Sequence, residues 1–221
     1  MRVITIGGLP AAGKTYTSKI LAKELNCIAI EVESLRWDFF DDNPRENMFY
    51  YTNNESFRDG EPLRDYYLRC TLYDKKTNFN MLVMWHKKAI EFIDKQIDQI
   101  FKSINNIQSN EDYVEFCGRY GDILNYTPKF KNFNNEILIV SHAFINVMKF
   151  SKVAYLKIDF DSDYQILKQR FLERENIKND NSLALDDYYK SYSEILKESD
   201  AIKMDTIKNN VLKEIKSLID K

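Results

Sequence analysis

Short apolar segments recur near both ends of the chain, and polar residues border each of them. Their length and their β-branched content are typical of buried parallel strands. Between these segments, apolar residues return every three or four positions, as in helices that cover a sheet. The alternation predicts a single three-layer α/β domain with a five-stranded parallel sheet. The predicted strands are Val3–Gly7, Cys27–Val32, Glu136–Val140, Val153–Ile158 and Ala201–Met204. The predicted helices are Lys14–Leu25, Asp163–Glu175, Leu185–Lys197 and Ile207–Ile219.

A long insert separates the second and third predicted strands, from about residue 41 to 135. Residues 81–104 within it place Trp85, Ile93, Ile97 and further apolar residues on one helical face. We expect this helical insert to pack over the carboxyl edge of the sheet, where ligands of open α/β sheets bind. A helical addition far from the site is the alternative. The core of the domain, which spans residues 1–221, is then residues 1–40 and 136–221.

Residues 8–15 read Gly-Leu-Pro-Ala-Ala-Gly-Lys-Thr, the GxxxxGK[ST] spacing of a phosphate-binding loop, or Walker A motif. Glycines at both ends let the backbone turn its N–H groups inward around a phosphate. Lys14 then reaches the β- and γ-phosphates, and the Thr15 hydroxyl ligates Mg²⁺. The loop lies between a predicted strand and a predicted helix, which is the order that the mechanism requires. The predicted nucleotide-binding residues are Gly8, Leu9, Pro10, Ala11, Ala12, Gly13, Lys14, Thr15 and Tyr16.

Glu31 and Glu33 stand two residues apart at the end of the second predicted strand, so their side chains point to the same face. Glu31 is a candidate Mg²⁺ ligand. Glu33 is a candidate catalytic and substrate-binding residue, which accepts the proton of an attacking hydroxyl or orients that hydroxyl. Solvated side chains at a strand end are the alternative for both.

With these motifs in place, the chain resembles P-loop kinases of the nucleoside-monophosphate-kinase-like group, in particular small-molecule kinases of the shikimate, gluconate and 2-phosphoglycerate type. Ile30-Glu31-Val32-Glu33 stands where shikimate kinase-like proteins carry Asp-x-Asp, and Glu33-Ser34-Leu35-Arg36 resembles their Asp-x-apolar-Arg. Gln169 to Arg174 resembles the arginine-bearing lid of these kinases. The resemblance covers roughly residues 1–40 and 136–221 and implies a P-loop fold that uses ATP and Mg²⁺.

Three arginines are candidate anion-binding residues. Arg170 and Arg174 lie one helical turn apart and, as lid residues, converge on the triphosphate as catalytic groups, unless they form surface ion pairs with Glu173 or Glu175. Arg36 either binds an anionic group of the acceptor or pairs with Glu33 or Asp38. A further set in the insert either forms an acceptor pocket or lies on an amphipathic helix. That set is Arg58, Arg64, Arg69, Tyr50, Tyr51, Tyr66 and Tyr67.

The third predicted strand lacks the acidic residue that usually follows it in P-loop proteins, and Ser141 and His142 stand there instead. His142 either binds the substrate or makes a local hydrogen bond, and His86, in the long helix, is more typical of a structural histidine. Asp159 is a possible substitute for the missing acid, but Asp159, Asp161 and Asp163 fit better at the start of a helix. Ser162 with Gln165 has the spacing of a capping box for that helix.

Composition argues against several classes of protein. A net charge of −2 and a sequence pI of about 5.8 argue against a surface for long nucleic acids. The three cysteines have no zinc spacing and predict reduced thiols in the cytoplasm. No apolar run is long enough to span a membrane, and the first strand begins too early to leave room for a signal peptide.

The sequence therefore predicts an ATP-dependent kinase that transfers the γ-phosphoryl group to a hydroxyl of a small metabolite. Two alternatives stay open. One is a nucleoside, nucleotide or RNA-end kinase, for which the tyrosines of the insert stack a base. The other is a non-catalytic nucleotide-binding regulator, which the missing acid after the third strand favours.

Overall fold

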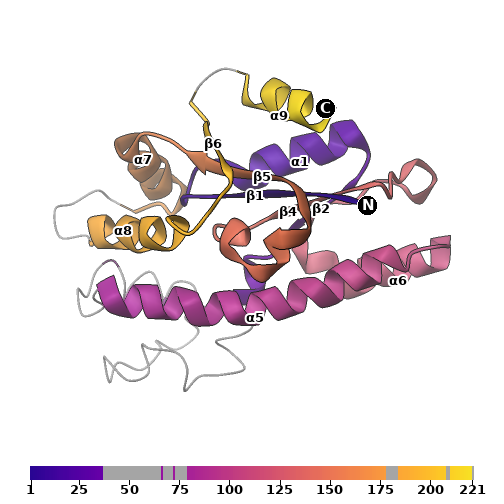
Figure 1. Cartoon of the computed structure of the whole chain (residues 1–221), viewed down its shortest axis with the longest axis horizontal. Coiled ribbons are helices and arrows are strands. Elements are labelled where there is room, and N and C mark those ends of the chain that lie inside the picture. The colour runs from indigo at the N-terminus through magenta and orange to yellow at the C-terminus, as the bar shows by residue number, and fades with distance from the viewer. Residues whose placement is uncertain (37–65, 67–71, 73–78, 178–183, 208–209, 221) are drawn as a thin grey trace.

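The computed structural model describes residues 1–36, 66, 72, 79–177, 184–207 and 210–220. In these residues the chain forms a six-stranded sheet in the order β3-β2-β4-β1-β5-β6 (Figure 1). The strands are β1 (Arg2–Gly8), β2 (Ile28–Glu31), β3 (Leu124–Tyr126), β4 (Ile137–Ser141), β5 (Ala154–Asp161) and β6 (Ile202–Asp205). The helices are α1 (Lys14–Leu25), α5 (Phe79–Asn105), α6 (Asn110–Tyr120), α7 (Tyr164–Arg174), α8 (Leu185–Leu196) and α9 (Val211–Ile219).

The sheet is buried between two layers of helices. Figure 1 shows α1 and α9 on one side of it and α5 and α8 on the other. The central strand β1 is buried from Val3 to Gly8, as expected for a parallel strand that is covered on both faces. β1 pairs in parallel with β4 on one side and with β5 on the other. The loop that follows β1 therefore opens at the centre of the carboxyl edge of the sheet, where ligands of such folds bind.

The prediction of a purely parallel, five-stranded sheet is wrong by one strand. β3 pairs antiparallel with β2, with Ala29 opposite Tyr126, and makes the sheet mixed. The remaining strands pair in parallel and lie within a few residues of the predicted positions. β3 has only three residues, too few to show an alternating pattern.

Two helix starts also differ from the predictions. Asp163, and not Ser162, caps α7, because its carboxylate accepts from the N–H groups of Gln165 and Ile166. Ser162 instead bonds to Asp205 and Thr206 at the end of β6, where its hydroxyl ties two parts of the carboxyl edge together. The last helix begins at Val211 rather than Ile207.

The long helix predicted over residues 81–104 is confirmed as α5. Its buried face includes Trp85, Ile93 and Ile97. Asp94 anchors the helix, since its carboxylate accepts from the backbone N–H groups of Lys149 and Phe150 at 3.1 and 2.8 Å. The middle of α5 thereby lies against the connection between β4 and β5. None of the helices in the described part of the chain, α5 included, is long and apolar enough to cross a bilayer.

Candidate functional site

The phosphate loop leaves β1 at two glycines whose backbone has no space for a side chain. Gly8 has φ +114°, and a Cβ at this position would lie 2.1 Å from the carbonyl oxygen of Phe160 on β5. A Cβ on Gly7 would lie 2.3 Å from Oδ1 of Asp159. The loop therefore begins where residues of β5 leave no room for a Cβ on β1, and only glycine fits there.

The loop ends at α1, whose first residue is Lys14. Gly13 precedes the helix with φ 88°, and no side chain caps the helix start. The first N–H groups of a helix have no partner within the helix, so an uncapped start presents donors to an anion. Nζ of Lys14 donates to the carbonyl oxygens of Gly8 and Leu9 at 3.1 and 2.7 Å, which holds the ammonium group at the mouth of the loop.

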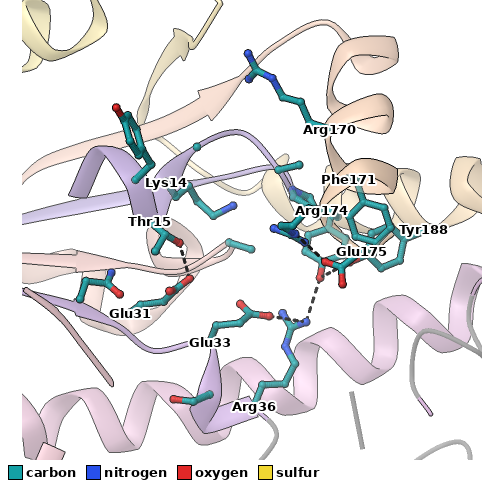
Figure 2. Close-up of a pocket in the computed structure, with 18 of the residues that line it drawn as sticks. Lys14, Thr15, Glu31, Glu33, Arg36, Arg170, Phe171, Arg174, Glu175 and Tyr188 are labelled. Carbon is teal, nitrogen blue, oxygen red and sulfur yellow. Dashed lines mark hydrogen bonds and ion pairs between the residues drawn. The ribbon is translucent and has the colours of Figure 1, made fainter. Parts of the chain in front are cut away.

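The loop forms one wall of a cavity of about 640 Å³. Figure 2 shows Lys14, Thr15, Glu31 and Glu33 on one side of this cavity. Pro10, Ala11, Gly13 and Tyr16 line the cavity with them. Of the other predicted nucleotide-binding residues, Gly8 and Leu9 contribute the carbonyl groups that hold Lys14, and Ala12, within the loop, is buried.

Thr15 and Glu31 provide two neighbouring oxygen atoms that fit a Mg²⁺ ion. The Thr15 hydroxyl donates to Oε1 of Glu31 at 2.7 Å. Burial raises the pKa of Glu31, and the Thr15 hydrogen bond opposes that shift. Mg²⁺ is usually bound by one or two protein oxygens together with phosphate and water, and these two oxygens could fill that part.

Glu33 lies between two buried nitrogen donors. Its Oε1 lies 3.1 Å from Nη1 of Arg36, and its Oε2 lies 3.1 Å from Nε2 of His142. Partial burial by itself raises the pKa of Glu33, but Arg36, His142 and Lys14 outweigh this and hold it well below its usual range. The carboxylate is therefore ionised at every physiological pH.

The pKa of Lys14 is lowered as well, but for a lysine this favours the neutral form over the charged one. Burial lowers the pKa of Lys14 to about 8, with Arg174 acting in the same direction against Glu33 and Glu31. A phosphate group at the loop would restore the charge of this side chain, because an anion nearby favours the ammonium form.

Arg36 pairs with Glu33, which is one of the predicted alternatives. The Arg36 side chain is 1% exposed, and Nη1 also donates to the hydroxyl of Tyr192 at 3.0 Å. Its Cζ lies 5.3 Å from the ring centre of Trp85, and the rings of Phe144 and Tyr192 lie at 5.8 and 5.9 Å. Arg36 thus lines the cavity beside Glu33, with aromatic rings around its guanidinium group and an ion pair to the Glu33 carboxylate.

His142, by contrast, lies behind Glu33. It is 1% exposed, and it does not line the cavity. Its Nδ1 accepts from the N–H group of Phe144, so the ring proton belongs on Nε2, which faces Glu33. His86 is buried beside the hydroxyl of Ser191 and the ring of Phe144, in agreement with a structural histidine.

Arg170 and Arg174 come from α7, on the other side of the cavity. Figure 2 shows the side chain of Arg174 turned toward Lys14, whereas Arg170 extends farther from it. Nε of Arg174 pairs with the buried Glu175 at 2.7 Å, while 53% of the Arg174 side chain stays exposed. The predicted Glu175 partner is therefore present. It holds Arg174 by one edge of its guanidinium group.

Asp159 does not start a helix. It lies within β5, 1% exposed, and its carboxylate accepts from Asn146, Ser199 and Lys203 at 2.7, 2.5 and 2.8 Å. With Gly7 against its Oδ1, Asp159 supports the start of the phosphate loop and does not face the cavity.

Some residues that line the cavity are not among the site residues predicted from the sequence. Asp122 and Asn125 reach it from the end of the insert, because β3 pairs beside β2. Glu175, Tyr188 and Tyr192 reach it from the end of α7 and from α8. The spacing of Tyr188 and Tyr192 on one face of α8 is the only local signal for any of them. Of the predicted acceptor residues in the insert, Tyr66 is buried, and the others lie outside the described residues.

The chain matches no protein-family model and no curated protein sequence. Among solved structures, TT1252 from Thermus thermophilus is 9% identical, with a TM-score of 0.53 over 99% of this chain and 94% of that one. A shikimate kinase from Aquifex aeolicus is 12% identical, with a TM-score of 0.44 over 99% and 96%. A gluconokinase from Sinorhizobium meliloti is 12% identical, with a TM-score of 0.39 over 98% and 88%. At these identities, the likeness to TT1252 concerns the α/β fold.

Proposed function

We propose that this protein is an ATP-dependent kinase that phosphorylates a hydroxyl group of a small metabolite. One observation carries the proposal: Lys14, the Thr15–Glu31 pair and the ionised Glu33 line a single cavity. A phosphoryl donor at the loop and a hydroxyl acceptor at Glu33 would therefore meet in one space.

The loop side of the cavity binds and neutralises the nucleotide. Main-chain N–H groups at the start of α1 donate to phosphate oxygens, and Lys14 places a positive charge beside them. Thr15 and Glu31 hold Mg²⁺ with their neighbouring oxygens. When bound, ATP with Mg²⁺ supplies the γ-phosphoryl group for transfer. Arg174 faces Lys14 across the cavity and adds positive charge where negative charge builds during the transfer.

The acceptor side orients a hydroxyl. Glu33 accepts a hydrogen bond from that hydroxyl and aims its oxygen at the loop. A carboxylate with so low a pKa is a weak base, which is sufficient here because phosphoryl transfer depends mainly on positioning and on charge stabilisation. Arg36 and His142, one at each carboxylate oxygen, hold Glu33 in one orientation.

The pairing of Arg36 with Glu33 bears on which chemical class of acceptor the cavity would bind. Arg36 is a predicted ligand for an anionic acceptor, and it lines the cavity with its charge already paired with Glu33, so an anion would meet less net positive charge there. Asp122, Asn125 and Ser34 line the same region. These side chains suit a polyol or another neutral polyhydroxy compound.

A nucleotide-binding regulator without transfer activity is the second candidate, because Ser141 and His142 stand where an acidic residue usually follows the strand. Isothermal titration with ATP and Mg²⁺, followed by an ADP-release assay with a library of hydroxyl compounds, separates the two. ADP release that rises with one chemical class of acceptor supports the kinase. Tight binding of ATP with no transfer to any acceptor supports the regulator.

A further inference from the structure

Three buried tyrosines of α8 lie in the wall of the cavity or directly behind it. Tyr188, Tyr189 and Tyr192 are 4%, 3% and 2% exposed. The cavity wall formed by α7 and α8 carries Phe171, Tyr188 and Tyr192, whereas Tyr189 lies behind this wall. The proposed mechanism uses none of the three hydroxyl groups.

Tyr189 connects the phosphate loop to the arginine-bearing helix. Its hydroxyl lies 3.3 Å from the carbonyl oxygen of Pro10 in the loop and 3.0 Å from that of Leu167 in α7. One hydroxyl proton is therefore shared between two carbonyl groups that belong to different elements. Leu167 lies two helical turns before Arg174 on α7. Because both residues belong to one helix, a shift of the Leu167 carbonyl would be accompanied by a shift of Arg174.

The ring of Tyr189 is fixed by its neighbours. Its centre lies 5.2 Å from that of Tyr164 and 6.2 Å from that of Phe171, both in α7, and both pairs are edge-to-face. The ring packs on the same helix that the hydroxyl contacts. Because of this packing, a change in the position of α7 would move the hydroxyl relative to the loop.

We propose that Tyr189 is a positioning residue, which sets the distance between the phosphate loop and Arg174 and so allows both to bind the same polyphosphate. The proposal rests on the proposed nucleotide site. Tyr189 itself touches no nucleotide. Its hydroxyl acts through Pro10 on one side and through α7 on the other.

A double-mutant cycle tests this role. The dissociation constant of a non-hydrolysable ATP analogue with Mg²⁺ is measured for the wild type, Tyr189→Phe, Arg174→Ala and the double variant. In the wild type, Arg174→Ala weakens binding about tenfold, the loss expected for a charge-assisted hydrogen bond. In the Tyr189→Phe background, the same substitution weakens binding only about threefold, because α7 no longer holds Arg174 at the phosphates.

Tyr113→Phe is the matched control. Its buried hydroxyl donates to the carbonyl of Pro128 in the insert, so the substitution removes the same kind of bond between two residues that do not line the cavity. With Tyr113→Phe, the effect of Arg174→Ala stays about tenfold, because the two sites share no partner. Melting temperatures of both tyrosine variants show that they are folded under the conditions of the titration.

Equal effects of Arg174→Ala with and without the Tyr189 hydroxyl would overturn the proposal, and so would an Arg174→Ala variant that binds the analogue as the wild type does. Failure of the proposed function is distinguishable from either. If the protein binds the analogue and shows the coupling but transfers no phosphoryl group, the role of Tyr189 stands and the kinase proposal is wrong. If the protein binds no nucleotide, both the kinase proposal and the proposed role of Tyr189 are wrong.

Discussion

Oε2 of Glu33 lies 3.1 Å from Nε2 of His142, although Glu33 follows β2 and His142 follows β4. Parallel pairing of these strands brings the two side chains together, since Glu31 and Ser141 are partners in the register. The Phe144 N–H group occupies Nδ1 of His142 and leaves the ring proton for Glu33. The position of one carboxylate is thus set by two neighbouring strands.

Substitution of Glu33 by Gln should reduce turnover while nucleotide binding persists. The amide cannot accept from the acceptor hydroxyl with the strength of a charged oxygen, and Arg36 loses its counter-charge. We expect kcat to fall about 10²-fold or more, and the dissociation constant of the ATP analogue to change little. Steady-state kinetics and calorimetry measure both quantities. Glu115→Gln, which disturbs an exposed ion pair with Arg119, is the matched control. A Glu33→Gln enzyme with wild-type kcat would contradict the role of Glu33.

The two histidines should make the fold sensitive to mild acid. Burial lowers the pKa of His142 and of His86, so the folded protein takes up fewer protons than the unfolded chain below pH about 6.5. The free energy of unfolding therefore falls as the pH falls through this window, by up to about 1.4 kcal/mol per pH unit for each histidine. Urea unfolding between pH 7 and 5.5 measures the slope, below the pKa of Lys14 and above the usual range of carboxylates.

The chain has only these two histidines, so His142→Asn should remove about half of that slope. The Asn oxygen can replace Nδ1 as the acceptor for the N–H group of Phe144. An unchanged slope in this variant would mean that His142 does not titrate as its burial requires.

Substitution of Lys14 by Ala should abolish nucleotide binding and turnover and leave the fold intact. Lys14 is the charged donor at the mouth of the loop, and loss of one such donor costs about 10²-fold or more in kcat/KM. Lys19→Ala, on the exposed face of the same helix, is the control and should keep full activity. Circular dichroism checks that both variants are folded. Near-normal turnover in folded Lys14→Ala would refute the role of the loop.

Nucleotide affinity should weaken as the pH rises through about 8, the pKa to which burial brings Lys14. The sign follows from the charge, since polyphosphate binds the ammonium form and the free protein loses that form above this pH. The loss approaches about tenfold per pH unit once the free protein is deprotonated. Calorimetry between pH 7 and 9.5, with ADP and Mg²⁺, measures the trend. A flat profile over that range would show that Lys14 keeps its proton in the free protein.

A methyl group at Gly8 should destabilise the protein strongly. It would lie 2.1 Å from the Phe160 carbonyl, and φ there is +114°. We expect a loss of about 3 kcal/mol or more, because strain and a clash with the backbone act together. Gly118→Ala in α6 is the matched control, since open space surrounds that position. It should be neutral or stabilising by up to about 1 kcal/mol. Thermal unfolding of both variants decides the point, and equal stabilities would contradict the close approach of β1 and β5.

Much of the fold follows from local pattern. The helix predicted over Lys14–Leu25 has those same bounds in the structure, because its start and its apolar spacing are both local. The parallel strands lie where apolar runs predict them. β3 escaped prediction because its three residues form a strand only through pairing with β2. Ser162 has the spacing of a capping box, but a closer partner, Asp163, caps the helix in its place.

The candidate site likewise has a part that the sequence predicts and a part that depends on tertiary contacts. The sequence by itself determined the phosphate loop, since its chemistry depends on glycines, a lysine and a threonine at fixed spacing between a strand and a helix. Only the tertiary structure decided that Arg36 is enclosed by aromatic rings, that His142 lies behind Glu33, and that Tyr189 reaches Pro10. These contacts join residues far apart in the chain. Their free energies depend on burial and on the partner supplied by another element, which residue spacing does not encode.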